Sequence, residues 1–272
     1  MSAKLVLSNT VDGITTLTMN NPSRLNGWTM EMMTALFDAL RTAANDDATK
    51  VAILTGADPY YCAGVNLGAT LTLDHPKKLH AFIVERNQAL FDAFIEFPKP
   101  ILIAANGPAI GACVTSATLC NGIIASHKAT FSTPFAALGI PPEGCSSEVF
   151  PRLLGDAANR MLGEEGYKPT AAEAKEIGLV SWVVPHETLL DEAHRIAQEW
   201  IENGETRRYP AGMTREQLLA VNARESVELA TAFLSPPFLM GQFKFLWSKK
   251  KRPPALMFLT LRATHPLWSR LL

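Results

Sequence analysis

The chain has 272 residues, of which 47% are hydrophobic and 19% charged, and its formal net charge is −1 at pH 7. This length supports a large core, and the near-neutral charge provides no basic field that would attract nucleic acid. No run of about 18 apolar residues occurs, so the sequence predicts no membrane span. We therefore expect a small-molecule role and no nucleic-acid partner.

The four cysteines show no C-x-x-C spacing and no paired histidines; they are Cys62, Cys113, Cys120 and Cys145. We interpret them as small buried residues in a reducing compartment rather than as disulfides or zinc ligands. The N-terminus lacks a long apolar segment and an arginine-rich transit pattern. Both observations favour the cytosol or an organelle that imports folded proteins.

The first half of the chain alternates between two kinds of pattern. Short apolar runs and apolar–polar alternation predict strands, whereas apolar residues at helical spacing predict helices. Strands are expected at residues 5–7, 14–19, 51–55, 101–105, 122–125 and 130–132. Helices are expected at residues 29–44, 75–97 and, after a loop of small residues, up to residue 120. This order of elements indicates an α/β fold.

The second half is mainly helical after Pro151. A capping box at Thr170 and Glu173 predicts a helix that Gly178 ends, followed by a strand at 179–184. Further helices are expected at residues 188–203, 214–234 and 238–250. We divide the chain into a core domain at 1–190, a helical region at 191–252 that packs against a neighbouring subunit, and a tail at 253–272.

A stiff turn surrounds Glu143. Pro141 and Pro142 fix φ and remove two backbone donors, and Gly144 can adopt conformations closed to other residues. Ser146 and the residues after it predict a helix start with a hydroxyl cap. A carboxylate held among the apolar residues of this segment would have a raised pKa, which suits a proton carrier. The alternative is a solvated loop residue, the more frequent role of a glutamate beside prolines.

Two loops of small residues, at 62–66 and 109–113, each follow a predicted buried strand. The second loop opens a helix, whose first N–H groups and positive dipole end point outward. Two such loops could aim two backbone N–H groups at one point and form an oxyanion hole that needs no side chain. The alternative is tight packing without a catalytic role, which is the commoner use of small residues.

Four motifs follow one another along the chain: Asn21-Pro-Ser-Arg-Leu-Asn26, Cys62-Ala-Gly-Val-Asn66, Asn106-Gly-Pro-Ala-Ile-Gly111 and Ala172-Glu-Ala-Lys-Glu-Ile-Gly-Leu-Val180. Together they resemble the crotonase (enoyl-CoA hydratase/isomerase) superfamily, from about residue 5 to about residue 250. The segment 138–147 is most similar to the peroxisomal Δ3,Δ2-enoyl-CoA isomerases. The resemblance implies an α/β crotonase (ClpP/crotonase-like) fold of repeated ββα units with a C-terminal helical appendage.

The resemblance also implies roles for single residues. By position, the oxyanion-hole amides fall on Val65 and Ala112, and the catalytic glutamate of the isomerases falls on Glu143. The two glutamates of the hydratases fall on Thr115 and Phe135, which exchange no proton at neutral pH, so hydration is not expected. The implied substrate-binding residues are Arg24, Ala63, Gly64, Asn66, Leu67, Gly111, Phe135, Leu138 and Lys249.

Some of these positions have other interpretations. Asn66 and Asn121 replace aspartates that are common in relatives, which leaves loop geometry and substrate preference open. Lys249 begins a basic run where relatives contact the 3′-phosphate of CoA from an adjacent subunit, but such a run also compensates a helix dipole. Arg24 fits a position near the nucleotide or an ordinary surface arginine.

The expected reaction moves the double bond of a 3-enoyl-CoA to the trans-2 position, in the β-oxidation of unsaturated fatty acids. The resemblance implies an acyl-CoA substrate, a homotrimer or hexamer, and no metal or redox cofactor. The alternatives are a crotonase-fold enzyme on another acyl-CoA, such as a hydratase or a secondary-metabolism lyase, and a non-catalytic acyl-CoA-binding relative. The resemblance favours a peroxisomal location, with the cytoplasm as alternative, because Ser269-Arg-Leu271 resembles a peroxisomal signal but Leu272 follows it.

Overall fold

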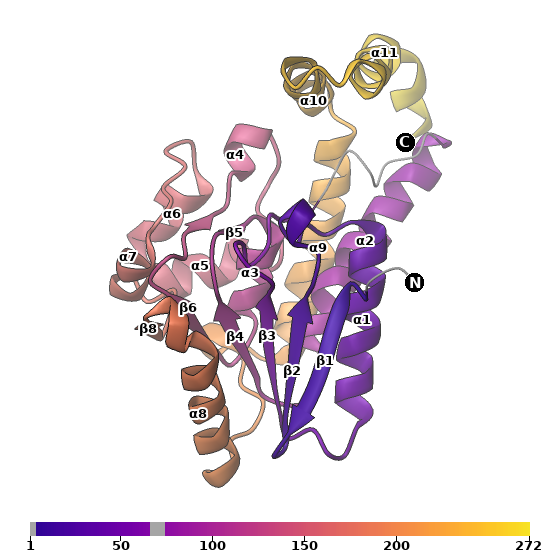
Figure 1. The fold of residues 1–272 in the computed structure, drawn as a ribbon. Coiled ribbons are helices and arrows are strands. Elements are labelled where there is room, and N and C mark those ends of the chain that lie inside the picture. The colour runs from indigo at the N-terminus through magenta and orange to yellow at the C-terminus, as the bar shows by residue number, and fades with distance from the viewer. Residues whose placement is uncertain (1–3, 66–73) are drawn as a thin grey trace.

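The computed structural model describes residues 4–65 and 74–272, and at its centre lies a six-stranded sheet (Figure 1). The strand order is β1-β2-β3-β4-β6-β8, and every pair is parallel except β1 with β2. A second sheet pairs β5 with β7 in parallel. The strands are β1 (Val6–Val11), β2 (Ile14–Met19), β3 (Val51–Gly56), β4 (Ile101–Ala105), β5 (Ala109–Ile110), β6 (Gly122–Ser126), β7 (Phe131–Ser132) and β8 (Trp182–Val184).

The helices lie on both faces of the central sheet and beyond one of its ends (Figure 1). They are α1 (Met30–Asn45), α2 (Pro76–Ile95), α3 (Ala112–Thr118), α4 (Phe135–Leu138), α5 (Ser146–Leu154), α6 (Asp156–Leu162), α7 (Ala171–Glu176), α8 (Leu189–Glu202), α9 (Arg215–Phe233), α10 (Pro236–Ser248) and α11 (Arg252–Trp268). The predicted strand and helix segments are confirmed, with ends shifted by a few residues. No helix in the described part of the chain is long and apolar enough to cross a membrane.

Strand β3 shows why its sequence is apolar throughout. Val51 and Ile53 pack with α8 on one face of the sheet. Ala52 and Leu54 belong to the main core on the other face, together with residues of α1 and α2. Since successive side chains of a strand point to opposite faces, a strand covered on both sides needs an unbroken apolar run.

The carboxyl ends of the parallel strands lead into the loops that form the site. The segment after β3 and the segment after β4 leave the sheet at the same end, because the two strands are parallel neighbours. Helices α2 and α9 pack along each other beside these loops (Figure 1). Helices α10 and α11 pack together over the ends of α2 and α9, in a third apolar cluster that includes Leu79, Leu229 and Phe258. The loops are thus enclosed by helices from distant parts of the sequence.

Candidate active site

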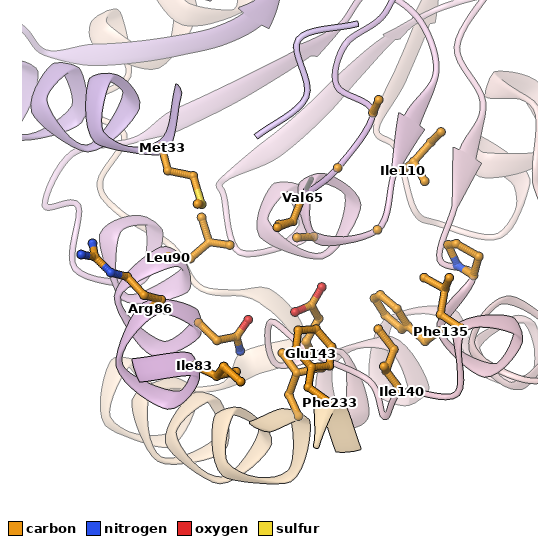
Figure 2. Close-up of a pocket in the computed structure, with 18 of the residues that line it drawn as sticks. Met33, Val65, Ile83, Arg86, Leu90, Ile110, Phe135, Ile140, Glu143 and Phe233 are labelled. Carbon is orange, nitrogen blue, oxygen red and sulfur yellow. The ribbon is translucent and has the colours of Figure 1, made fainter. Parts of the chain in front are cut away.

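A cavity of about 150 Å³ lies between the loops after β3 and β4, the segment from Pro134 to Glu143, and helices α1, α2 and α9. Its lining is apolar apart from the side chains of Arg86, Asn87 and Glu143 (Figure 2). The lining residues are Met30, Met33, Ala63, Gly64, Val65, Phe82, Ile83, Arg86, Asn87, Leu90, Ile110, Gly111, Ala112, Pro134, Phe135, Leu138, Ile140, Glu143, Leu229 and Phe233. Such a cavity suits a ligand that is mostly hydrocarbon with one reactive polar group.

Most of the predicted site residues meet at this cavity. Those that line it are Ala63, Gly64, Val65, Gly111, Ala112, Phe135, Leu138 and Glu143. Two others do not line it: Arg24 ends a short 3-10 helix, Pro22–Arg24, and Lys249 is exposed at the end of α10. Asn66 and Leu67 lie outside the described residues. The structure thus brings the oxyanion-hole and glutamate positions together, and separates them from the two basic residues.

Main-chain hydrogen bonds tie the two small-residue loops to each other. The amide of Cys62 donates to the Pro108 carbonyl at 3.3 Å, and the amide of Ile110 donates to the Cys62 carbonyl at 3.0 Å. Gly64 has φ +81°, and a Cβ added there would lie 2.5 Å from the Ile110 carbonyl oxygen. Only glycine therefore permits this close approach of the loops.

Side chains at the strand ends add a second connection between the same loops. Asn106 follows β4 directly, and Asp58 lies just after β3. The side-chain amide of Asn106 donates to Oδ1 of Asp58 at 2.8 Å. His186 Nε2 lies 3.0 Å from the other oxygen of Asp58. Asn106 also accepts from the Gly56 amide at 3.2 Å. These contacts fix the bases of both loops relative to the sheet.

The backbone amides of Val65 and Ala112 both belong to residues that line the cavity. Within residues 4–65 and 74–272, neither N–H donates a hydrogen bond to the protein. Ala112 is the first residue of α3, where backbone N–H groups have no partner inside the helix. Two such amides at one cavity have the hydrogen-bonding capacity that an oxyanion hole requires.

Glu143 is buried, with 7% of its surface exposed, and its carboxylate points into the cavity toward the side where Val65 lies (Figure 2). Burial, and secondly the negative charge of Glu225, raise the pKa of Glu143 to about 8. No group among the described residues donates a hydrogen bond to this carboxylate. The burial of Glu143 excludes a solvated loop glutamate, and the raised pKa has the direction expected for a desolvated carboxylate.

Helix α9 fixes the turn that carries Glu143 through hydrogen bonds to its backbone. The buried carboxylate of Glu225 accepts from the Cys145 amide at 2.6 Å and from the Ser147 amide at 2.9 Å. The predicted hydroxyl cap of α5 is wrong, because Ser146 is already inside the helix and its hydroxyl donates to the Glu143 carbonyl at 2.8 Å. A carboxylate from a distant helix therefore takes the place of a local cap.

The positions of the hydratase glutamates carry no acid or base. Phe135 lines the cavity with its ring, and Thr115 is fully buried. The Thr115 hydroxyl donates to the Ala112 carbonyl at 3.2 Å. A Cβ added to Gly144 would lie 2.6 Å from that hydroxyl oxygen, so Thr115 packs against the turn instead of facing the cavity. Glu143 is the only carboxylate in the described lining.

Helices α1, α2 and α9 contribute lining residues that the sequence did not single out. They are Met30, Met33, Phe82, Ile83, Arg86, Asn87, Leu90, Leu229 and Phe233. Glu225 was missed as well, although a signal for it exists. In α9 it falls in the buried stripe formed by Leu218, Val221 and Leu229, where a charged residue is unexpected unless it has partners.

The comparisons with known proteins show the family to which the chain belongs. Residues 9–216 match the family described as enoyl-CoA hydratase/isomerase. The chain is 34% identical over 267 residues to "Enoyl-CoA delta isomerase 2" of Rattus norvegicus, covering 92% of this chain and 65% of the rat protein. It is 30% identical over 264 residues to "Enoyl-CoA delta isomerase 3, peroxisomal" of Mus musculus, covering 92% of this chain and 80% of that protein.

A solved structure is also similar. The enoyl-CoA hydratase/isomerase from Pseudoalteromonas atlantica T6c superposes with a TM-score of 0.75 at 27% identity, covering 90% of this chain and 98% of the other. The chain therefore has the crotonase fold. It belongs to the enoyl-CoA hydratase/isomerase family, and it spans less than two thirds of the length of the rat relative.

Proposed function

We propose that this chain is an enoyl-CoA isomerase that converts a 3-enoyl-CoA to the trans-2-enoyl-CoA. One observation carries the proposal: the buried carboxylate of Glu143 faces a cavity that is also lined by Val65 and Ala112, whose backbone amides have no acceptor among the described residues. The names of the rat and mouse relatives support the same activity. Thr115 and Phe135, in place of two glutamates, argue against the addition of water.

The reaction needs one base and one site for negative charge. Glu143 takes the proton from C2, and the electron pair of that C–H bond moves toward the thioester oxygen to give a dienolate. The amides of Val65 and Ala112 donate to this oxygen, and loss of one comparable donor typically costs about 3 kcal/mol. The protonated Glu143 then delivers its proton to C4, so the double bond shifts from C3–C4 to C2–C3. This route requires no metal or redox cofactor.

The raised pKa of Glu143 fits both steps. A base with a pKa of about 8 holds a proton firmly enough to carry it, yet is ionised in a useful fraction near neutral pH. The base must be ionised to begin the reaction, so kcat/KM is expected to rise with pH and level off above about 8.

The proposal extends to the rest of the substrate and to the assembly. The acyl chain lies among the apolar side chains of α2 and α9, and Ala63, Gly64, Gly111, Phe135 and Leu138 surround the thioester. Asn66 and Leu67 stay predicted substrate-binding residues from the sequence. Arg24 and Lys249 contact the CoA moiety, Lys249 from the neighbouring subunit of a homotrimer or hexamer that residues 191–252 assemble. The name of the mouse relative supports a peroxisomal location, and the proposed reaction would serve the β-oxidation of unsaturated fatty acids there.

The test is an assay with 3-enoyl-CoA substrates of several chain lengths, followed by the absorbance of the conjugated product. We expect turnover by the wild type and a loss of about 10³-fold or more in kcat for Glu143→Gln, because the proton carrier is removed. The matched control is Glu148→Gln, which changes a partly exposed glutamate five residues further along the chain.

Three results would overturn the proposal. Retained isomerisation by Glu143→Gln would remove the assigned base. Hydration of a trans-2-enoyl-CoA without isomerisation would favour a hydratase. Binding of CoA thioesters with no turnover at any chain length would favour a non-catalytic relative.

A further inference from the structure

The carboxylate of Glu225 is fully buried, lies on α9, and is separated from Glu143 by 82 positions in the sequence. Burying a charge is unfavourable unless it is hydrogen-bonded. Both oxygens of Glu225 bind the catalytic turn: one accepts from the Cys145 amide at 2.6 Å and the other from the Ser147 amide at 2.9 Å. These are charge-assisted bonds of good length, so they define where the turn lies relative to α9.

The backbone of this turn needs such an external constraint. Gly144 has φ +66° and Cys145 has φ +65°, so two consecutive residues adopt the left-handed conformation. Cys145 is the N-cap of α5 and makes no side-chain capping bond. The Glu225 carboxylate satisfies two N–H groups at this helix start and places a negative charge at the positive end of the helix.

Glu143 belongs to the same hydrogen-bonded turn. Its carbonyl oxygen accepts from the Ser146 amide at 3.3 Å and from the Ser146 hydroxyl at 2.8 Å. Ser146 lies between Cys145 and Ser147, the two residues whose amides Glu225 holds. A displacement of the turn relative to α9 therefore moves the Glu143 carboxylate relative to the Val65 and Ala112 amides.

The two buried carboxylates also act on each other through their charges. The negative charge of Glu225 is the second cause, after burial, of the raised pKa of Glu143. Burial raises the pKa of Glu225 as well, to about 6, but its hydrogen bonds to the turn favour the ionised form. Glu225 thus ionises first and remains charged while Glu143 exchanges its proton, which is a division of roles between two carboxylates.

Among the described residues, the other charged groups near the turn come from α2, α5 and α9. Arg224 on α9 donates to the Ser147 hydroxyl at 3.2 Å and lies 3.5 Å from Glu148 on α5. Asp92 on α2 accepts from the Asn222 side chain at 2.9 Å, and Arg86 on α2 lines the cavity. A substitution of Glu225 leaves all of these groups in place.

We propose that Glu225 is a positioning residue for the isomerase: its carboxylate fixes the turn that carries Glu143, and its negative charge acts on the Glu143 carboxyl group. The effect of Glu225 on kcat rests on the proposed function. The effect of its charge on the Glu143 carboxyl group concerns the protein without substrate and can be measured independently.

The experiment compares Glu225→Gln with the wild type. Glutamine keeps the size of the side chain but removes the charge and replaces one acceptor by an NH2 group that cannot accept from an amide. We expect kcat to fall about 10- to 100-fold, because a shift of about 1 Å in a catalytic group has an effect of this size. We expect KM to change by less than about three-fold, since Glu225 does not line the cavity. The acid limb of the pH–rate profile moves to lower pH.

A substrate-free measurement accompanies the kinetics. The carboxyl stretching band of Glu143 is identified in infrared difference spectra by its absence in Glu143→Gln, and its titration is followed. In Glu225→Gln we expect this band to titrate at lower pH than in the wild type. The matched control is Glu228→Gln, one turn further along α9, whose carboxylate is half exposed near Arg224; it should retain wild-type kinetics and titration.

A second variant keeps the test informative if Glu225→Gln does not fold. Glu225→Asp retains the charge but is one methylene shorter, so we expect a reduced kcat with a Glu143 titration close to that of the wild type. Wild-type kcat and an unshifted titration in Glu225→Gln would overturn the inference while leaving the proposed function intact. A shifted titration in a protein without isomerase activity would instead support the effect of the Glu225 charge on Glu143 and overturn the proposed function.

Discussion

The two halves of the cavity are held in place by different means. The loops that end at Val65 and Ala112 are fixed by main-chain hydrogen bonds to each other and by polar side chains at the strand ends. The turn that carries Glu143 is fixed by one side chain from α9 and by close packing. The half proposed to stabilise negative charge thus depends on contacts among the loops and strand ends themselves, whereas the half proposed to move protons depends on a carboxylate from a distant helix.

Among variants that retain Glu143, the largest effect is expected where the backbone geometry itself is changed. In Gly64→Ala the new Cβ would lie 2.5 Å from the Ile110 carbonyl oxygen at a residue with φ +81°. The two loops would have to separate, and we expect kcat to fall about 10²- to 10³-fold, as for loss of one oxyanion-hole donor. Steady-state kinetics measure this effect. Gly204→Ala is the control, because Gly204 also has positive φ but open space around it; equal losses in both variants would contradict the role of the loop contact.

A smaller effect is expected for the turn. In Gly144→Ala the new Cβ would lie 2.3 Å from the Phe91 ring and 2.6 Å from the Thr115 hydroxyl. Side chains can change conformation to relieve such a clash more easily than a backbone carbonyl can. We therefore expect kcat to fall about ten-fold and the free energy of unfolding to fall by about 1–3 kcal/mol. Chemical denaturation and kinetics measure the two changes. Gly155→Ala, at the other end of α5, is the control, because Gly155 has positive φ but no atom within 4 Å of an added Cβ. It should keep the wild-type kcat and be destabilised less than Gly144→Ala.

A further effect concerns stability alone and its dependence on pH. The pKa of Glu143 is about 8 in the folded chain against an ordinary 4.5, so the folded state binds more protons than the unfolded state between these values. The free energy of unfolding therefore decreases as pH rises from about 4.5 to about 8. Glu143→Gln lacks this contribution and should exceed the wild type in stability above pH 8 by on the order of 1–4 kcal/mol.

Urea denaturation at pH 5 and pH 8.5 checks this prediction, with Glu148→Gln as the exposed control. The difference between Glu143→Gln and the wild type should be larger at the higher pH. The same difference at both values would show that Glu143 does not titrate abnormally in the folded state.

Much of the fold could be predicted from the sequence because its patterns are local. The unbroken apolar run of β3 indicated a strand covered on both faces, and Thr170 and Glu173 form the predicted capping box. The order of strands and helices, with the motifs that resemble the crotonase superfamily, was sufficient for the fold class. These features depend on residues close together in the chain.

The parts of the site that were missed depend on residues far apart. A local rule predicted that a serine hydroxyl caps α5. Two residues in the left-handed conformation move the helix start by one position, so Ser146 is already inside the helix. The carboxylate of Glu225 on α9 provides the cap instead. The apolar residues of α2 and α9 were indistinguishable from core residues, because an apolar helix face looks the same whether it meets another side chain or an empty cavity. The roles of Arg24 and Lys249 in binding CoA stay predictions.

Helix α9 has a consequence for how relatives of this protein can diverge. It carries Glu225, which holds the turn, and also Leu229 and Phe233, which line the cavity one and two turns further along. Nearly all of α9 lies beyond residue 216, where the family match ends. Exchanging this segment between homologues would alter the size of the cavity and the pKa of Glu143 in one step. Under the proposed function, substrate range and proton chemistry would then change together.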